Sequence, residues 1–190
     1  MNLEWMWPEN YFDFVYFRVL YGCVCDWEGL YTKAFCHLKP DRWMQHLEMD
    51  IRLESDHVTF EKKKILNQWG KLFIEAGEKT GYSFDIACGH KMKETLEAAG
   101  FIDIVEEPVI ILYGSWPRDL RFKEPGALIQ VSIEDSLDGL VTYLGIEILG
   151  WSKDEVTILI AKMQDIIKKR SNCSYIKAYV NHEPTMIYTY

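Results

Sequence analysis

The chain has 190 residues, 48% of them hydrophobic and 26% charged, which is typical of a globular protein with a core of its own. Its formal net charge of −8 argues against nucleic-acid binding, because such binding needs a surplus of Lys and Arg. No apolar stretch approaches the roughly 18 residues that a membrane span requires. We therefore predict one domain over residues 1–190 that binds neither nucleic acid nor membrane.

Cysteine usage and the N-terminus suggest the compartment. The segment Met1–Trp5 lacks the charged start and apolar stretch of a signal peptide, so we expect a cytoplasmic protein. Five cysteines fit reduced thiols better than a disulfide framework. Cys23 and Cys25 share one side of any extended segment, but zinc would need two more ligands, and no second pair has suitable spacing. We predict no metal.

The first half of the chain begins with a predicted strand over Phe12–Leu20. Asp26 then has the side chain of a helix N-cap, and Lys39-Pro40 ends the helix that it begins. The apolar residues of that helix follow a helical repeat: Trp27, Leu30, Tyr31, Ala34, Phe35 and Leu38.

A second strand is predicted over Trp43–Ile51, because polar and apolar side chains alternate there. One face of this strand carries four side chains, namely Met44, His46, Glu48 and Asp50. The other face carries Trp43, Leu47, Met49 and Ile51.

The second half continues the alternation of helix and strand. Helices are predicted around 58–77 and 91–99, the latter closed by Gly100, and a strand over 102–113 is interrupted or bent near Pro108. The remaining predicted features are a connection framed by Pro117 and Pro125, an apolar helix over 127–149, a capping box at Ser152–Glu155 that begins an amphipathic helix, and a last strand over 175–180.

Several local motifs occur in an order that resembles the fungal LaeA-like, or TAM-domain, class I methyltransferases. The strand Phe12–Arg18 resembles the family's fourth strand, and Leu47–Asp50 ends a strand like its fifth. The other motifs are Asp26-Trp27, Leu38-Lys39-Pro40, Glu97–Phe101, Gly114–Pro117, Leu149–Ser152 and the strand that opens with Tyr175. The resemblance covers nearly the whole chain, but only the C-terminal half to two-thirds of the family's domain.

The resemblance implies an α/β fold: a partial class I methyltransferase (Rossmann-like) fold, with a mixed sheet of about four strands and flanking helices. The family's first three strands and its glycine-rich cofactor turn have no counterpart in this sequence. Its Lys-Pro-Gly-Gly turn reads Lys39-Pro40-Asp41-Arg42, which removes conformational freedom at two positions. We therefore expect that S-adenosylmethionine is not bound in the family's manner, and we predict no cofactor.

In the family the strand that resembles Phe12–Leu20 is central. Here one of its edges would have unpaired backbone groups, which folded proteins cover. We expect the Trp5-Met6-Trp7 segment or a second copy of the chain to cover that edge, and we prefer a homodimer.

Candidate site residues follow from the rule that open α/β sheets bind ligands beyond the carboxyl ends of their strands. Arg18, His46 and Glu48 are the candidate catalytic residues, since a carboxylate paired with a histidine can serve as acid and base and an arginine can polarise a carbonyl. The candidate substrate-binding residues near the strand ends are Tyr21, Asp50 and His57. The resemblance adds Trp69, Tyr82, Trp116 and Tyr143, which lie in the helical portions that form the substrate-side cover in the family. The alternative, which we prefer for any one of these residues, is structural: Glu48 and Arg18 are partners of each other, His57 is solvated, and the aromatic residues belong to the core.

Three hypotheses for function follow. The first is a cofactor-independent cyclase or isomerase, for example a pericyclase catalysing a Diels–Alder cyclisation, which folds an apolar small molecule of fungal secondary metabolism between aromatic walls. The second is a non-catalytic pseudo-methyltransferase that docks another protein. The third is one half of a split S-adenosylmethionine-dependent methyltransferase.

Overall fold

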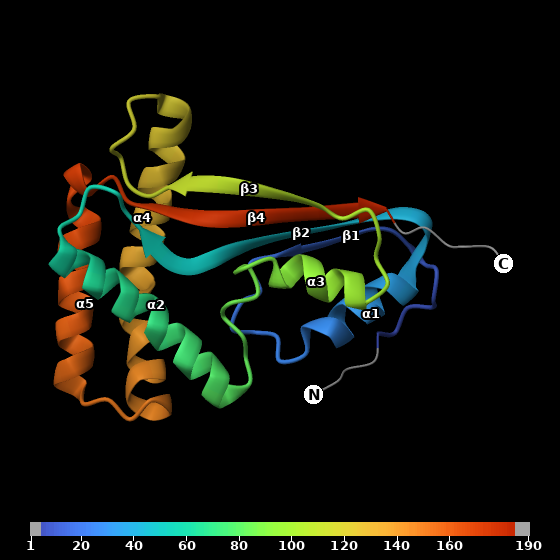
Figure 1. The fold of residues 1–190 in the computed structure, drawn as a ribbon, viewed down its shortest axis with the longest axis horizontal. Helices are drawn as coiled ribbons and strands as arrows, with labels where there is room; N and C mark the ends of the chain where they lie inside the picture. Colours follow the sequence, from blue (N-terminus) through green and yellow to red (C-terminus); the bar gives the residue numbers. More distant parts are fainter. Residues whose placement is uncertain (1–4, 185–190) are drawn as a thin grey trace. The chain divides into compact units, whose positions relative to one another are not determined.

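The structure, a computed structural model, describes residues 5–184 (Figure 1). Residues 1–4 lie outside the described residues. They belong to the segment Met1–Trp5, in which the sequence lacks the features of a signal peptide. The elements in chain order are β1 (Phe12–Arg18), α1 (Trp27–His37), β2 (Leu38–Glu54), α2 (Phe60–Thr80), α3 (Lys91–Ala98), β3 (Val105–Leu112), α4 (Leu120–Thr142), the π-helix η1 (Tyr143–Ile148), α5 (Lys153–Lys168), the 3-10 helix η2 (Arg170–Asn172) and β4 (Tyr175–Pro184).

The four strands form one sheet in the order β1-β2-β4-β3. β1 pairs with β2 in parallel, and β4 runs opposite to its neighbours β2 and β3 (Figure 1). The predicted α/β fold with a four-stranded mixed sheet and flanking helices is therefore confirmed. β3 continues through Pro108 without a break. Proline has no backbone N–H, and on the outer side of an outermost strand no neighbouring strand needs that donor.

The chain divides into two compact units, and each is described separately. Unit 1 comprises the described residues within Met1–Met49, Asp85–Val109 and Ala178–Tyr190, and unit 2 comprises Asp50–Phe84 and Ile110–Lys177. β2, β3 and β4 each contribute residues to both units, since the unit boundaries fall inside these strands.

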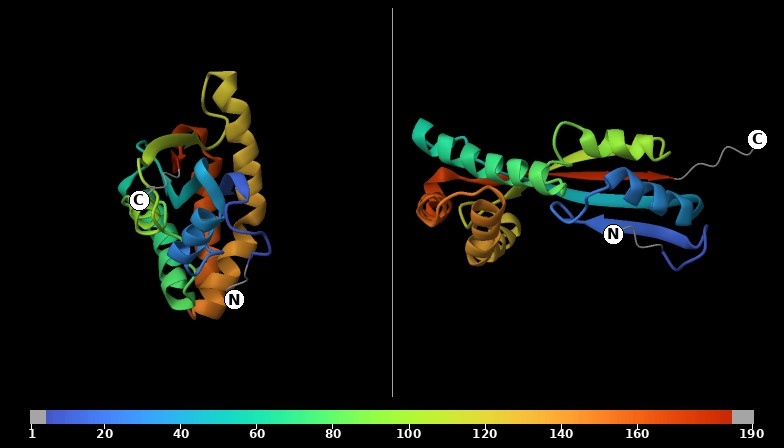
Figure 2. Two further views of the ribbon diagram at one scale, coloured as in Figure 1. Left: turned by 90° about the vertical axis from the view of Figure 1, so that its right-hand side faces the viewer. Right: turned by 90° about the horizontal axis from the view of Figure 1, so that it is seen from below.

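The core of unit 1 forms where α1 and α3 lie side by side over the strands (Figures 1 and 2). Val15 of β1 and Met44 of β2 point into it. The helices contribute buried side chains at the spacing expected of one helical face. Those residues are Trp27, Tyr31, Ala34, Met92 and Leu96.

In unit 2, α2, α4, η1 and α5 pack against one another. Gly81 ends α2 with a left-handed φ of 78°, and its N–H donates to Gly77 O. Ser152 begins α5 with the predicted capping box, in which its side chain accepts from Glu155 N and the Glu155 side chain accepts from Ser152 N.

The start of α4 differs from the prediction. The helix begins at Leu120 rather than Ala127, so Pro125 lies inside it instead of framing a connection. The Asp119 side chain accepts from Arg121 N and so caps the helix. Asp119 therefore marks the start of α4 in the sequence, but Pro125 suggested a later start. Gly126 is required beside it, because a Cβ there would lie 2.5 Å from Gly114 O.

The capping box gives a direct test of this fold. Replacing Ser152 by Ala removes one of its two reciprocal hydrogen bonds, so Ser152→Ala should lower the free energy of unfolding by about 1 kcal/mol. Urea unfolding followed by circular dichroism measures the loss. Ser132→Ala, an exposed position within α4, is the matched control and should change it far less. Equal losses in the two variants would contradict the capping role.

Candidate functional site

The candidate site is the loop that follows the carboxyl end of β1 and leads to the N-cap of α1, residues 19–26. Val19 has a left-handed φ of 51°, although β-branched residues adopt that region at a cost. Its N–H still donates to Leu47 O at 3.0 Å, so the loop leaves the sheet abruptly just after this bond. A strained residue at the carboxyl end of a parallel strand is a common mark of a binding site.

The buried carboxylate of Glu48 holds this loop in place. Its Oε2 accepts from Leu20 N at 2.7 Å and from Tyr21 N at 3.1 Å, and its Oε1 accepts from Met49 N at 2.9 Å. The Glu48 side chain is fully buried, so these amides replace the water that a carboxylate otherwise needs. Glu48 therefore fastens the loop to β2.

His46 lies next to Glu48 on the same face of β2, also fully buried. Its Nδ1 is 2.7 Å from the Tyr31 hydroxyl, and its Nε2 is 3.4 Å from Glu48 Oε2. The second contact lacks the geometry of a hydrogen bond. The Trp27 ring stacks on the imidazole with centroids 5.4 Å apart, and Phe17 meets it edge-on. The imidazole is thus held on several sides.

The far end of the loop is fixed by the N-cap of α1. The Asp26 side chain accepts from Gly29 N at 2.8 Å, as the sequence predicted for a cap. A Cβ on Gly29 would lie 2.2 Å from Asp26 Oδ2, so only glycine leaves room for this carboxylate. The loop is anchored at both ends by acidic side chains.

Tyr21 lies half-buried in the middle of the loop. Burial raises the pKa of its phenol, and the negative charge of Glu48 raises it further. The phenol therefore stays protonated at neutral pH. Arg18, the last residue of β1, is exposed beside the start of the loop.

Unit 1 thus contains four of the predicted site residues near this loop: Arg18, Tyr21, His46 and Glu48. Sequence reasoning missed Tyr31, whose hydroxyl orients His46. Tyr31 was assigned to the apolar face of α1, and that face is indeed buried. The sequence offered one signal for this contact. Tyr31 carries a hydroxyl on the buried face of α1, and that face packs toward the strand β2, which carries His46 on its buried face.

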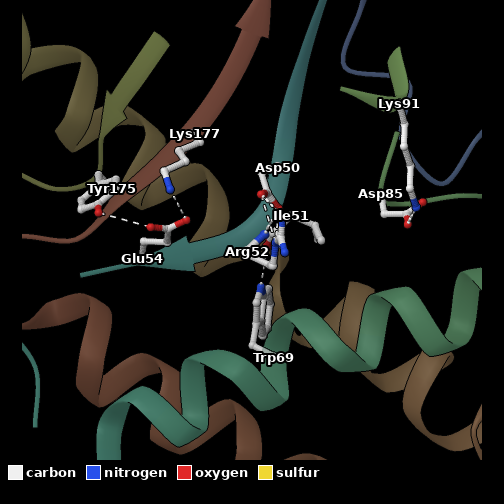
Figure 3. A network of polar contacts seen from close by, with 9 residues as sticks. All are labelled: Asp50, Ile51, Arg52, Glu54, Trp69, Asp85, Lys91, Tyr175 and Lys177. Atoms are coloured by element: carbon white, nitrogen blue, oxygen red, sulfur yellow. Dashed lines mark hydrogen bonds and ion pairs between the residues drawn. The ribbon is translucent and has the colours of Figure 1, made fainter. Parts of the chain in front are cut away.

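The other predicted residues belong to unit 2. Asp50 accepts from Arg52 Nη2 at 2.6 Å within β2. Trp69 Nε1 of α2 donates to Ile51 O at 3.1 Å, so Trp69 contacts β2 at the residue next to Asp50 (Figure 3). Trp116 Nε1 donates to Ser174 O at 3.1 Å. These contacts fix the protein's own backbone and side chains.

Three further candidates are exposed in unit 2 and are distributed over different elements. His57 follows β2, Tyr82 follows α2, and Tyr143 begins η1. In the described part of the chain, no hydrogen bond, ion pair or ring contact joins them to Asp50 or Trp69. Figure 3 also shows a separate polar contact on β2, in which Glu54 accepts from Tyr175 and pairs with Lys177.

Relatives of the chain were found among curated proteins, whereas no protein-family model matches it. Methyltransferase pytC of Aspergillus terreus is 30% identical over 83% of this chain and 48% of the relative. Secondary metabolism regulator LAE1 of Cochliobolus heterostrophus is 31% identical over 72% of this chain and 44% of the relative. Secondary metabolism regulator laeA of Aspergillus fumigatus is 24% identical over 84% and 42%.

Two solved structures cover the chain almost completely. Phosphoethanolamine N-methyltransferase 2 of Haemonchus contortus, in complex with S-adenosyl-L-methionine, is 15% identical over 96% of this chain and 35% of that one, with a TM-score of 0.47. The [4+2]-cyclase SpnF is 16% identical over 97% and 53%, with a TM-score of 0.46. Likeness at this level says nothing about activity.

The α/β fold and the sequence relatives together define the chain as a protein of the class I methyltransferase type. It is similar to the fungal LaeA-like methyltransferases, as the resemblance predicted. The chain spans about half the length of the curated relatives it matches.

The described residues do not fit the methyl donor that this family implies. A nucleotide cofactor needs a glycine-rich turn and helix amides that are open to the ligand. Within residues 5–184, the three helices that follow strands are α1, α2 and α4, and each has its first amides capped by its own side chain. Those caps are Asp26, Thr59 and Asp119.

Among residues 5–184, His, Cys, Asp and Glu form no group of three or more that could hold a metal ion. None of the helices in that range combines the length and apolar character needed to cross a membrane.

The role of Glu48 can be measured at the loop itself. Glu48→Gln keeps the side-chain shape but removes the charge that its amide partners face. It should lower the free energy of unfolding by about 2 kcal/mol, the usual contribution of a hydrogen bond to a charged group. Hydrogen exchange should accelerate selectively at Leu20 and Tyr21. Glu107→Gln, an exposed residue of β3, is the control. Unchanged exchange at the two loop amides would show that Glu48 does not hold the loop.

The phenol of Tyr21 provides a second test, by 13C NMR of tyrosine Cζ across pH. In the wild type its pKa should lie above the ordinary value of 10.0, and Glu48→Gln should bring it closer to that value. Since the pKa is raised in the folded state, the stability contributed by the neutral phenol is fully present below pH 10.0 and is lost as pH rises through the folded-state pKa. Titration at the ordinary value in the wild type would contradict the burial of Tyr21.

Proposed function

We propose that this chain is the substrate-side part of a LaeA-like catalytic unit of fungal secondary metabolism. It binds an apolar small molecule at the loop of residues 19–26, and polypeptide outside residues 5–184 holds the methyl donor. One observation carries the proposal: Glu48 and Asp26 hold this loop in a strained shape at the carboxyl end of β1, where open α/β sheets bind ligands.

The geometry suggests how the residues divide the work. His46 and Glu48 are fully buried, so in this conformation they are positioning residues that fix the loop rather than groups that contact a substrate. Arg18 is exposed at the end of β1 and can donate hydrogen bonds to a carbonyl or an oxyanion of the bound molecule. Tyr21 offers a protonated phenol from the loop itself.

This proposal favours the split-methyltransferase hypothesis, which is supported by the family and by the relatives' greater length. Cofactor-independent cyclisation, the first hypothesis from the sequence, stays a prediction. It differs in one measurable respect, since a cyclase turns over its substrate with no donor and leaves the mass unchanged.

A two-step experiment tests the proposal. The 15N-labelled chain is first titrated with fractions of a secondary-metabolite extract from the source fungus, and we expect amide shifts at Leu20, Tyr21 and Gly22. Each binding fraction is then incubated with S-adenosylmethionine, with the chain alone or with the segment of pytC that this chain does not match. A methylated product only in the presence of that segment is the expected result.

Controls separate the competing outcomes. Arg18→Gln should weaken binding about tenfold by removing a charged donor, whereas Arg42→Gln, an exposed residue of β2 distant in sequence from the loop, should not. An isomer of unchanged mass made by the chain alone would replace this proposal with the cyclase. Absence of amide shifts in the loop for every fraction would leave a non-catalytic interaction protein.

A further inference from the structure

Two buried nitrogen atoms in unit 1 have no hydrogen-bond partner among the described residues. They are Trp27 Nε1 and His46 Nε2. Trp27 is 7% exposed and His46 is 0% exposed, so neither nitrogen lies at the surface. Burial of such a group without a partner costs stability, and in native proteins it commonly marks a functional group or a place where a water or a ligand binds.

The two nitrogens belong to rings that are in contact. The Trp27 ring stacks on the imidazole of His46, with centroids 5.4 Å apart and an angle of 27° between the ring planes. Trp27 begins α1 directly after the loop of residues 19–26, and His46 lies on β2. One small molecule bound beneath this loop can therefore reach both nitrogens.

The surroundings of His46 favour a proton on Nε2. This nitrogen is 3.4 Å from Glu48 Oε2, and without a proton it would direct a lone pair toward the carboxylate. With the proton on Nε2, Nδ1 accepts from the Tyr31 hydroxyl, which is 2.7 Å away. Trp27 and His46 thus each offer an N–H donor that has no acceptor.

The loop of residues 19–26 packs against the core in which Trp27 lies. Its side chains Leu20 and Val24 both contact that core. The buried Glu48 holds the loop through only two of its amides, and the left-handed φ of Val19 strains its first residue. A strained segment with few hydrogen bonds to the rest of the chain opens more readily than the strands beside it.

We propose that Trp27 Nε1 and His46 Nε2 donate to the oxygen of a neutral carbonyl compound, which enters when the loop opens. A carbonyl oxygen supplies the acceptor that both N–H groups lack. The negative charge of Glu48 beside His46 opposes a carboxylate or a phosphate at the same place. The apolar core around Trp27 suits the hydrocarbon part of such a ligand. This inference rests on the proposed function, since it names the ligand chemistry at the same loop.

The first test uses acetophenone, a neutral aromatic ketone, titrated into the full chain labelled with 15N. The indole N–H signal of Trp27, assigned from the Trp27→Phe variant, should shift, and the amide signals of Leu20 and Tyr21 should shift with it. Ethylbenzene, which lacks the oxygen, and benzoate, which carries a charge, should leave the indole signal in place. An unmoved indole signal with acetophenone overturns the inference, as does an equal shift with ethylbenzene or benzoate.

A pair of variants isolates the indole N–H. Trp27→Phe keeps an aromatic ring but removes the N–H, so it should weaken acetophenone binding about fivefold, as followed by the Leu20 amide. Trp116→Phe is the matched control, because the Trp116 N–H already donates to Ser174 O in unit 2, and its binding should be unchanged. Circular dichroism confirms that both variants fold. Binding by Trp27→Phe as tight as that of the wild type overturns the inference.

Two further measurements separate the alternatives. The 15N chemical shifts of the His46 ring should show a proton on Nε2, and a proton on Nδ1 alone overturns the inference. A nuclear Overhauser effect between Trp27 Hε1 and water that persists at saturating acetophenone also overturns it, because a structural water would then be the acceptor. If extract fractions shift the loop amides while acetophenone leaves the Trp27 indole unmoved, the proposed function stands and this inference alone fails.

Discussion

A carboxylate enclosed in a protein core requires hydrogen-bond donors, and this requirement shapes the candidate site. Glu48 obtains its donors from the backbone amides of Leu20, Tyr21 and Met49. Two of these amides can reach it only because Val19 turns the chain through a left-handed φ at the end of β1. The buried charge and the backbone strain therefore offset each other, and removal of either would release the loop.

Much of the fold could be predicted from local patterns. The alternation over residues 43–51 separated the two faces of β2, but it did not indicate that the face with Met44, His46, Glu48 and Asp50 would be the buried one. Asp26 and Ser152 marked helix starts through their capping chemistry. The patterns failed where tertiary contacts override propensity. β2 begins at Leu38 and includes Pro40, and α4 continues through Pro125.

The candidate site was predictable in part. A spacing of two placed His46 and Glu48 on one strand face, and the rule for open sheets selected the end of β1. Alternation alone could not reveal that the Tyr31 hydroxyl contacts His46 Nδ1 or that three backbone amides donate to Glu48. These contacts make both residues supports of the loop. The aromatic candidates Trp69, Tyr82, Trp116 and Tyr143 came from the resemblance to the family's substrate-side cover. They belong to unit 2, whereas the residues that hold the loop belong to unit 1.

The hydrogen bonds and ring contacts described for the loop and for His46 join residues within Phe17–Met49, a continuous stretch of unit 1. These contacts are made inside the chain. The outward edge of β1 has the opposite property, because its backbone groups can be satisfied only by water or by another strand. The same seven-residue strand thus presents a preformed loop at one end and an incomplete edge along its length. A partner at that edge would change what surrounds the loop without rebuilding it, so assembly and ligand binding should be separable in this protein.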